Sequence, residues 1–182
     1  EDSYKFGMIC GRLHKILDSF SSETLDRPKY NLDYFLDESF TSFERSYLYE
    51  FDSSHFFDTL YSCLRTKLAV YNFNKNEQFN WGICHGDLNT GNVKFNSTHL
   101  GLFDFDELCY SWRIYDMSCF LWDLYYPIIE PTIKDVINRR KNYDSFLNGY
   151  CKKYKLLTSE IEYAKYFVLV RDFWLLKVHL ES

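Results

Sequence analysis

Apolar side chains recur every three or four residues along five stretches of the chain, which is the spacing that places them on one face of an α-helix. The pattern predicts helices over residues 4–20, 56–71, 115–126, 133–151 and 159–180. Asp52, Ser53 and Ser54 stand before the second of these helices and offer side chains that cap a helix N-terminus. The chain is therefore expected to be largely helical.

Between Trp81 and Phe105 the helical spacing gives way to short apolar segments separated by Gly, Asn and Asp. These segments predict strands at residues 81–84, 93–95 and 100–103. The last two should pair as a β-hairpin over residues 93–103, whereas the loosely patterned residues 21–49 predict a loop with a short helix. Because no repeat or linker divides the chain, we expect a single domain over residues 1–182, mainly α with a small β-hairpin insert.

The composition narrows the class of protein. Of the 182 residues, 46% are hydrophobic and 20% aromatic, which is too apolar for a disordered chain and predicts an aromatic core. The net charge of −5 provides no broad basic surface for a nucleic acid. The six cysteines include no CxxC pair, which argues against a structural zinc site and favours buried, reduced thiols. The chain does not open with a basic segment and an apolar signal core, so we expect a cytoplasmic protein, and no apolar run is long enough for a membrane span. We expect no membrane partner and, from the charge, no nucleic-acid partner.

The polar residues that suggest a chemical function lie in one segment, residues 83–106. Asp87 precedes Asn92 by five residues, and Asp104 follows Asn92 by twelve, on the far side of the predicted hairpin. Because a hairpin brings its two ends together, Asn92 and Asp104 should be neighbours in space. Amide and carboxylate oxygens are the ligands that Mg²⁺ prefers, so the sequence predicts a magnesium site at Asn92 and Asp104.

The order of these residues follows the protein-kinase pattern H-x-D-x-x-x-x-N and then D-F, with His85 in the first position. Phosphoryl transfer needs a carboxylate that orients the attacking hydroxyl and accepts its proton, and it needs ligands for the metal ions on the nucleotide phosphates. Asp87 suits the first task. Asn92 and Asp104 suit the second, and would bind Mg²⁺ and with it the nucleotide.

Gly86 and Asp106 stand where a protein kinase has Arg and Gly, and with them the segment resembles the aminoglycoside phosphotransferase and choline kinase family, which has H-G-D-x-x-x-x-N followed by D-F-[DE]. The Gly-x-x-x-Gly-Arg-Leu-His run at residues 7–14 is also similar to the first helix of that family's helical lobe, and the resemblance covers residues 4–126. It implies a kinase-like fold, ATP as co-substrate, Mg²⁺ and a small-molecule hydroxyl acceptor. It further implies that Asp116, at the start of a helix, braces the catalytic loop.

Two residues of the motif have other expected roles. His85 is expected to form a structural hydrogen bond rather than to transfer a proton. For Asp106, a place beside the metal and a role in bracing the loop are equally open. Asp87, Asn89 and Asn92 also have a plain alternative reading as turn formers, which is common for these residue types.

A kinase of this fold closes over its nucleotide with a second lobe, but the chain contains no G-x-G-x-x-G and nothing similar to V-A-I-K. We therefore expect it to be the C-terminal catalytic and substrate lobe, with the N-terminal nucleotide lobe as a partner elsewhere in the full-length protein. Two alternatives stay open. The missing lobe favours a non-catalytic pseudokinase or interaction domain, whereas a metal-dependent phosphoesterase is disfavoured because only five histidines occur.

The sequence does not select the acceptor, and an aminoglycoside, an amino alcohol, a sugar or a similar metabolite is compatible with it. The four tryptophans would either form a cage for an ammonium group or, as is commoner, belong to the core. These tryptophans are Trp81, Trp112, Trp122 and Trp174.

Overall fold

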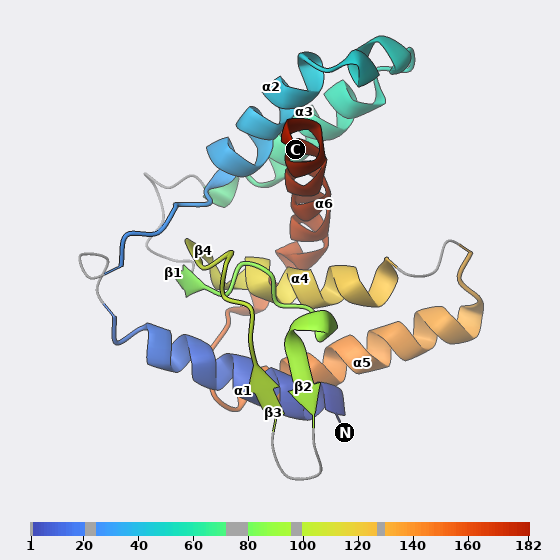
Figure 1. Ribbon diagram of the computed structural model, residues 1–182. Coiled ribbons are helices and arrows are strands. Elements are labelled where there is room, and N and C mark those ends of the chain that lie inside the picture. Colours follow the sequence, from blue (N-terminus) through green and yellow to red (C-terminus); the bar gives the residue numbers. More distant parts are fainter. Residues whose placement is uncertain (1, 21–24, 72–79, 96–99, 127–129) are drawn as a thin grey trace.

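Helices make up most of the computed structural model of the protein, which describes residues 2–20, 25–71, 80–95, 100–126 and 130–182 (Figure 1). The α-helices are α1 (Asp2–Leu17), α2 (Ser39–Glu44), α3 (Phe56–Lys67), α4 (Arg113–Tyr125), α5 (Ile133–Cys151) and α6 (Thr158–Glu181). The strands are β1 (Trp81–Cys84), β2 (Val93–Phe95), β3 (Leu100–Leu102) and β4 (Cys109–Trp112). The expected mainly α-helical fold is confirmed, and each of the five expected helices is present within a few residues of its predicted ends.

The strands form two separate antiparallel pairs. β2 pairs with β3, with Val93 opposite Leu102, which confirms the predicted hairpin; its turn lies outside the described residues. β1 pairs with β4, with Trp81 opposite Trp112, and β4 was not predicted. All four residues of β4 are buried, so the strand shows no alternation of apolar and polar positions by which it could be recognised.

The loosely patterned region contains more helix than expected. In its described part, a π-helix (Asp33–Glu38) runs directly into α2, and the Asn31 side chain accepts a hydrogen bond from the backbone N–H of Tyr34 at 3.0 Å. The backbone of Tyr30 donates to the carbonyl of Tyr110 at 2.8 Å, which attaches this region to β4. Short 3₁₀ turns occupy Tyr47–Phe51, Ala69–Tyr71 and Thr90–Asn92.

The predicted cap of α3 is confirmed for Asp52. Its carboxylate oxygens accept hydrogen bonds from the backbone N–H groups of Phe56 and Phe57, at 3.0 and 2.9 Å. These are two of the donors that the first turn of a helix leaves without a partner, so the cap fixes where α3 begins.

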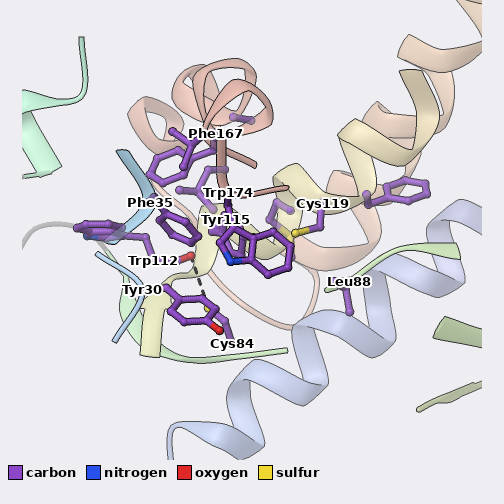
Figure 2. Close-up of a cluster of buried hydrophobic side chains, with 14 of the residues drawn as sticks. Tyr30, Phe35, Cys84, Leu88, Trp112, Tyr115, Cys119, Phe167 and Trp174 are labelled. Carbon is purple, nitrogen blue, oxygen red and sulfur yellow. Dashed lines mark hydrogen bonds between the residues drawn. The ribbon is translucent and has the colours of Figure 1, made fainter. Parts of the chain in front are cut away.

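The core is aromatic, as predicted, and is formed by α1, α4, α5 and α6 together with the strands (Figure 1). Tyr115 and Cys119 of α4 lie in the same buried cluster as Phe35 and Trp174 (Figure 2). Four of the six cysteines are buried, but Cys63 and Cys151 are exposed, so the expectation of six buried thiols was wrong for these two. None of the helices within the described ranges is long and apolar enough to cross a membrane.

Helices α1 and α5 cross at a point where the backbones lie very close together. A Cβ atom at Gly7 of α1 would overlap the carbonyl oxygen of Phe146 in α5. Since a backbone oxygen in the middle of a helix cannot move aside as a flexible side chain can, the crossing requires glycine at this position.

We expect Gly7→Ala to lower the free energy of unfolding by about 2 kcal/mol, because the added methyl group forces the two helices apart. Gly101→Ala is the matched control, since a Cβ at Gly101 meets no atom within 4 Å, and it should change stability by less than about 0.5 kcal/mol. Urea unfolding of both variants measures the difference. Equal stabilities would contradict the close crossing.

Candidate active site

The loop between β1 and β2, residues 85–92, is held at its start by one buried carboxylate. Asp116, in the first turn of α4, accepts hydrogen bonds from the backbone N–H groups of His85 at 2.7 Å and Gly86 at 2.8 Å. Nε2 of His14 in α1 lies 2.8 Å from the same carboxylate. Asp116 and His14 are both fully buried. A single carboxylate therefore connects α1, the loop and α4.

Burial by itself raises the pKa of the Asp116 carboxyl, but the hydrogen bonds that it accepts from His14 and the loop outweigh this effect, and its pKa lies below the ordinary value of 3.8. Burial is also the largest influence on His14 and lowers its pKa below 6.5; the charge of Arg113 adds to this, while Asp116 opposes it. Nδ1 of His14 lies 2.6 Å from the hydroxyl of Tyr150, whose pKa is raised by burial. A neutral His14 that donates from Nε2 and accepts the Tyr150 proton at Nδ1 satisfies all of these contacts.

Gly86 is required by the backbone of the loop. Its φ of +86° lies in the left-handed region that favours glycine, and a Cβ at this position would overlap the carbonyl oxygen of Glu107. Gly86 thus allows the chain to turn tightly between His85, whose backbone binds Asp116, and Asp87.

Asp87 and Asn92, which the sequence assigns to the base and to the metal, lie in direct contact. Nδ2 of Asn92 donates to both the backbone carbonyl and Oδ2 of Asp87, each at 2.9 Å. Because a carbonyl oxygen can only accept, the amide nitrogen must face Asp87, and Oδ1 of Asn92 faces the other way. The loop therefore fixes the orientation of this amide and leaves its oxygen unused by Asp87.

The turn inside the loop is formed by neighbouring polar side chains. Oδ1 of Asn89 accepts from the backbone N–H of Gly91 at 2.7 Å, so Asn89 has the turn-forming role that was the plain alternative. The backbone N–H of Thr90 donates to the carboxylate of Asp123 in α4 at 3.0 Å. The loop is thus attached to α4 at both Asp116 and Asp123.

His85 holds the end of the hairpin that precedes Asp104. Nε2 of His85 lies 3.1 Å from the carbonyl oxygen of Phe103, and its ring lies 4.6 Å from the ring of Phe105. The backbone N–H of Phe103 donates to the carbonyl of Asn92 at 3.2 Å. Asp104, with φ +63°, is the next residue after Phe103. The hairpin therefore places the backbone of Asp104 one residue beyond the residue that pairs with Asn92.

The side chains of Asp104 and Asp106 are not among the described hydrogen-bond partners of the Asp87 carboxylate. Both residues are exposed, and the described partners of the Asp87 carboxylate are Arg171 and Asn92. The backbone carbonyl of Asp106, not its side chain, accepts a hydrogen bond from Arg27 at 3.5 Å.

The donor set at positions 92 and 104 suits a hard cation such as Mg²⁺, because it offers one amide oxygen with a fixed orientation and one exposed carboxylate. A different group, His14, Cys84 and Asp116, has ligand atoms within 4.8 Å of one another. In that group His14 and Asp116 bind each other, and Sγ of Cys84 lies 3.5 Å from the carbonyl oxygen of Trp112. Since these atoms already satisfy one another, the group is a buried hydrogen-bonded cluster.

Arg171, which lies within α6 and whose side chain is 4% exposed, was not predicted from the sequence. Its Nη2 atom donates to Oδ1 of Asp87, and Nη1 lies 3.3 Å from Sγ of Cys119. The guanidinium lies over the rings of Trp122 and Trp174, at 4.9 and 5.6 Å from their centroids. A basic residue inside an apolar helix is a sequence feature that could have identified it, because arginine is rarely buried without a partner.

The same contacts show what two of the four tryptophans bind. Trp122 and Trp174 do flank a cation, but that cation is Arg171 of the chain itself. Trp81 and Trp112 pack edge to face against each other, with centroids 4.9 Å apart.

The fold is shared with solved structures of small-molecule kinases. An amicoumacin kinase, hAmiN, in complex with AMP-PNP, Ca²⁺ and Ami superposes with a TM-score of 0.71 at 19% identity, over 98% of this chain and 51% of that one. A microcompartment-associated aminopropanol kinase superposes with a TM-score of 0.66 at 18% identity, over 97% of this chain and 53% of the other. An aminoglycoside-3'-phosphotransferase of type VIII gives 0.58 at 16% identity, over 93% and 60%. The chain therefore has a kinase-like fold.

The sequence model of the Phosphotransferase enzyme family matches residues 5–150, and the chain belongs to this family. Amicoumacin kinase of Bacillus subtilis is 31% identical over 80 residues, which are 43% of this chain and 24% of that protein. An uncharacterized protein of Synechocystis is 23% identical over 180 residues, which are 98% of this chain and 46% of its own length. The chain therefore spans half or less of the length of these relatives.

The contacts of His14 predict that the protein loses stability in mild acid. Because its pKa is lowered in the folded state, the unfolded chain binds a proton near pH 6.5 that the folded chain does not, and acidification below that pH favours unfolding. One such group lowers the free energy of unfolding by up to about 1.4 kcal/mol per pH unit. Asp116 affects stability at lower pH. Its contribution to the free energy of unfolding is present above pH 3.8 and is lost as the pH falls through its depressed pKa.

Thermal unfolding between pH 7 and pH 5 measures this effect. His14→Gln removes the titrating group but keeps a donor for Asp116, so its stability should vary less with pH over this range than that of the wild type. Parallel pH profiles for the two proteins would show that His14 does not cause the acid sensitivity.

Proposed function

We propose that the protein transfers the γ-phosphate of ATP to a hydroxyl group of a small molecule. The observation that carries this proposal is the contact of Asp87 with Asn92 in a loop whose backbone is bound by the buried Asp116. Membership of the Phosphotransferase enzyme family supports it, as do relatives named amicoumacin kinase and aminopropanol kinase.

In this proposal Asp87 orients the acceptor hydroxyl and takes up its proton as the phosphoryl group is transferred. Asn92 holds Oδ2 of Asp87, so the carboxylate keeps one orientation. A positioned base of this kind contributes about 100-fold or more to the rate. His85 has a supporting role through the Phe103 carbonyl, and Asp116 supports the backbone of the loop.

Asn92 and Asp104 are the proposed ligands of Mg²⁺. When bound, the ion neutralises the negative charge of the transferred phosphoryl group. The presence of AMP-PNP and Ca²⁺ in the hAmiN complex supports a nucleotide together with a divalent cation. Asp106 is assigned no part, because Asp104, and not Asp106, directly follows the residue whose backbone pairs with Asn92.

We also infer that a separate nucleotide lobe completes the ATP site, with this chain as the C-terminal catalytic lobe. The chain covers about half of the solved kinases that share its fold, which supports this division. The relatives' names include amine-bearing alcohols, so amino alcohols and aminoglycosides are the first acceptors to test.

The test is phosphate transfer from radiolabelled ATP and Mg²⁺ by the full-length gene product, with amicoumacin, 1-amino-2-propanol, kanamycin and choline as acceptors. We expect one or more of these to be phosphorylated, and Asp87→Asn to lower kcat by about 100-fold or more with the fold retained. Asp144→Asn is the control, since Asp144 is exposed on α5 and pairs only weakly with Arg140, at 3.9 Å.

Three outcomes would contradict the proposal. Turnover at the wild-type rate by Asp87→Asn would show that Asp87 is not the base. Binding of Mg·ATP without transfer to any acceptor or to water would indicate a pseudokinase. Hydrolysis of an aryl phosphate with Mn²⁺ in the absence of ATP would indicate a phosphoesterase.

The metal assignment predicts that Asp104→Asn raises the Mg²⁺ concentration needed for half-maximal rate by about tenfold or more, because the ion loses its charged ligand. Asp106→Asn is the matched control on the next exposed carboxylate and should leave this concentration within about twofold. Mn²⁺ binding followed by electron paramagnetic resonance gives a readout that does not depend on turnover. Equal Mn²⁺ affinities for both variants would rule out Asp104 as the ligand.

A further inference from the structure

We propose that Arg171 is a positioning residue for this reaction: from α6 it holds the carboxylate of Asp87 in the orientation that meets the acceptor hydroxyl. The inference rests on the proposed function, because it assumes that Asp87 is the base. It adds a residue that lies outside the family-matched residues 5–150 and far from the loop in sequence.

The two oxygens of the Asp87 carboxylate have different partners. Oδ2 accepts from Asn92, which belongs to the same loop, and Oδ1 accepts from Arg171. A carboxylate held by only one oxygen can still rotate about its Cβ–Cγ bond, whereas partners on both oxygens fix its plane. Arg171 is, among the described residues, the side-chain partner that ties Asp87 to the helical scaffold rather than to its own loop.

Arg171 is itself held in place by aromatic rings. Its guanidinium lies over Trp122 of α4 and Trp174 of α6, and Nε1 of Trp122 donates to Asp172 at 2.7 Å, which fixes the Trp122 ring. A planar, delocalised guanidinium stacks on aromatic faces in a way that a lysine ammonium does not. The position of the charge is therefore set by the packing of α4 against α6.

Arg171 lies in the interior, where the residue as a whole is 3% exposed. Its Nε atom is buried and has no hydrogen-bond partner in the described part of the chain. The guanidinium contacts Cys119 and Asp87 through its two terminal nitrogens and the two tryptophans through its face, and Asp87 is its ion-pair partner in the described part of the chain.

The three attachments of the loop then have separate tasks. Asp116 binds the backbone at His85 and Gly86, and Asp123 binds the backbone at Thr90. Arg171 alone of these three binds the carboxylate that would meet the substrate. Its loss should therefore impair the chemical step more than the binding of either substrate.

The test uses Arg171→Gln and Arg171→Lys in the full-length gene product, with Mg·ATP and the acceptor that gives the fastest transfer, or with water as acceptor and phosphate release as the readout. We expect Arg171→Gln to lower kcat by about 10- to 100-fold, with the KM values for ATP and acceptor within about threefold, because a misplaced base slows the chemical step. Arg171→Lys should recover part of the loss, since it restores the charge but not the stacking.

A double variant shows whether Arg171 acts through Asp87. If it does, Asp87→Asn combined with Arg171→Gln has the same kcat as Asp87→Asn alone, since the carboxylate to be positioned is already gone. A general structural role would instead multiply the two losses. Lys177→Gln is the matched control on α6, because Lys177 also combines an ion pair, with Glu38 at 2.7 Å, and an aromatic contact, with Tyr34 at 4.2 Å.

The outcomes separate this inference from the proposed function. If Asp87→Asn is impaired but Arg171→Gln turns over within about twofold of the wild type, the role of Arg171 is refuted and the proposed function stands. If Asp87→Asn itself is unimpaired, both fall. Should Arg171→Gln fail to fold, Arg171→Lys alone and in combination with Asp87→Asn carries the same comparison, and multiplied losses there overturn the inference.

Discussion

The site depends on one ionised carboxylate buried in the interior, that of Asp116. Taking a charge out of water is costly, and here the cost is offset by donors that the fold already places around it: the N–H groups of His85 and Gly86 and the ring of His14. Without this acceptor, two loop amides and one imidazole would be buried unpaired, at about 1–3 kcal/mol each. The loop conformation, the crossing of α1 and the start of α4 are therefore parts of one arrangement.

Helix α4 holds the loop and Arg171 through side chains along its length. Asp116, Cys119 and Asp123 are three and four residues apart, so they share one face of the helix. Asp116 binds the first residues of the loop, Cys119 contacts Arg171, and Asp123 binds Thr90. Seven residues of helix span about 10 Å, which allows one rigid element to hold both ends of the loop. The Asp87–Asn92 contact between them then needs only the tight turn that Gly86 permits.

The features that could be predicted from the sequence depend on contacts between residues close together in the chain. The features that were missed depend on contacts between distant residues. The helices, the hairpin and the presence of Asp87 and Asn92 in one loop follow from local spacing, because the residues concerned lie a few positions apart or across one short turn. β4 was missed because its four residues are all buried and show no alternation. Arg171 and the His14 contact of Asp116 were missed because their partners lie 84 and 102 residues away, and no local pattern encodes such a pairing.

The contacts inside the loop and the contacts that orient the loop differ in their separation along the chain. The loop can form its own contacts, such as Asn92 to Asp87 and Asn89 to Gly91, from residues within a few positions of one another. Its orientation comes from α1, α4 and α6, which lie far apart along the chain, and contacts between distant segments form only when long stretches of chain have been ordered. The types of the reacting groups are thus set locally, whereas their orientation is a property of the completed fold. A motif in the sequence can identify the former, but only the packing of the helices determines the latter.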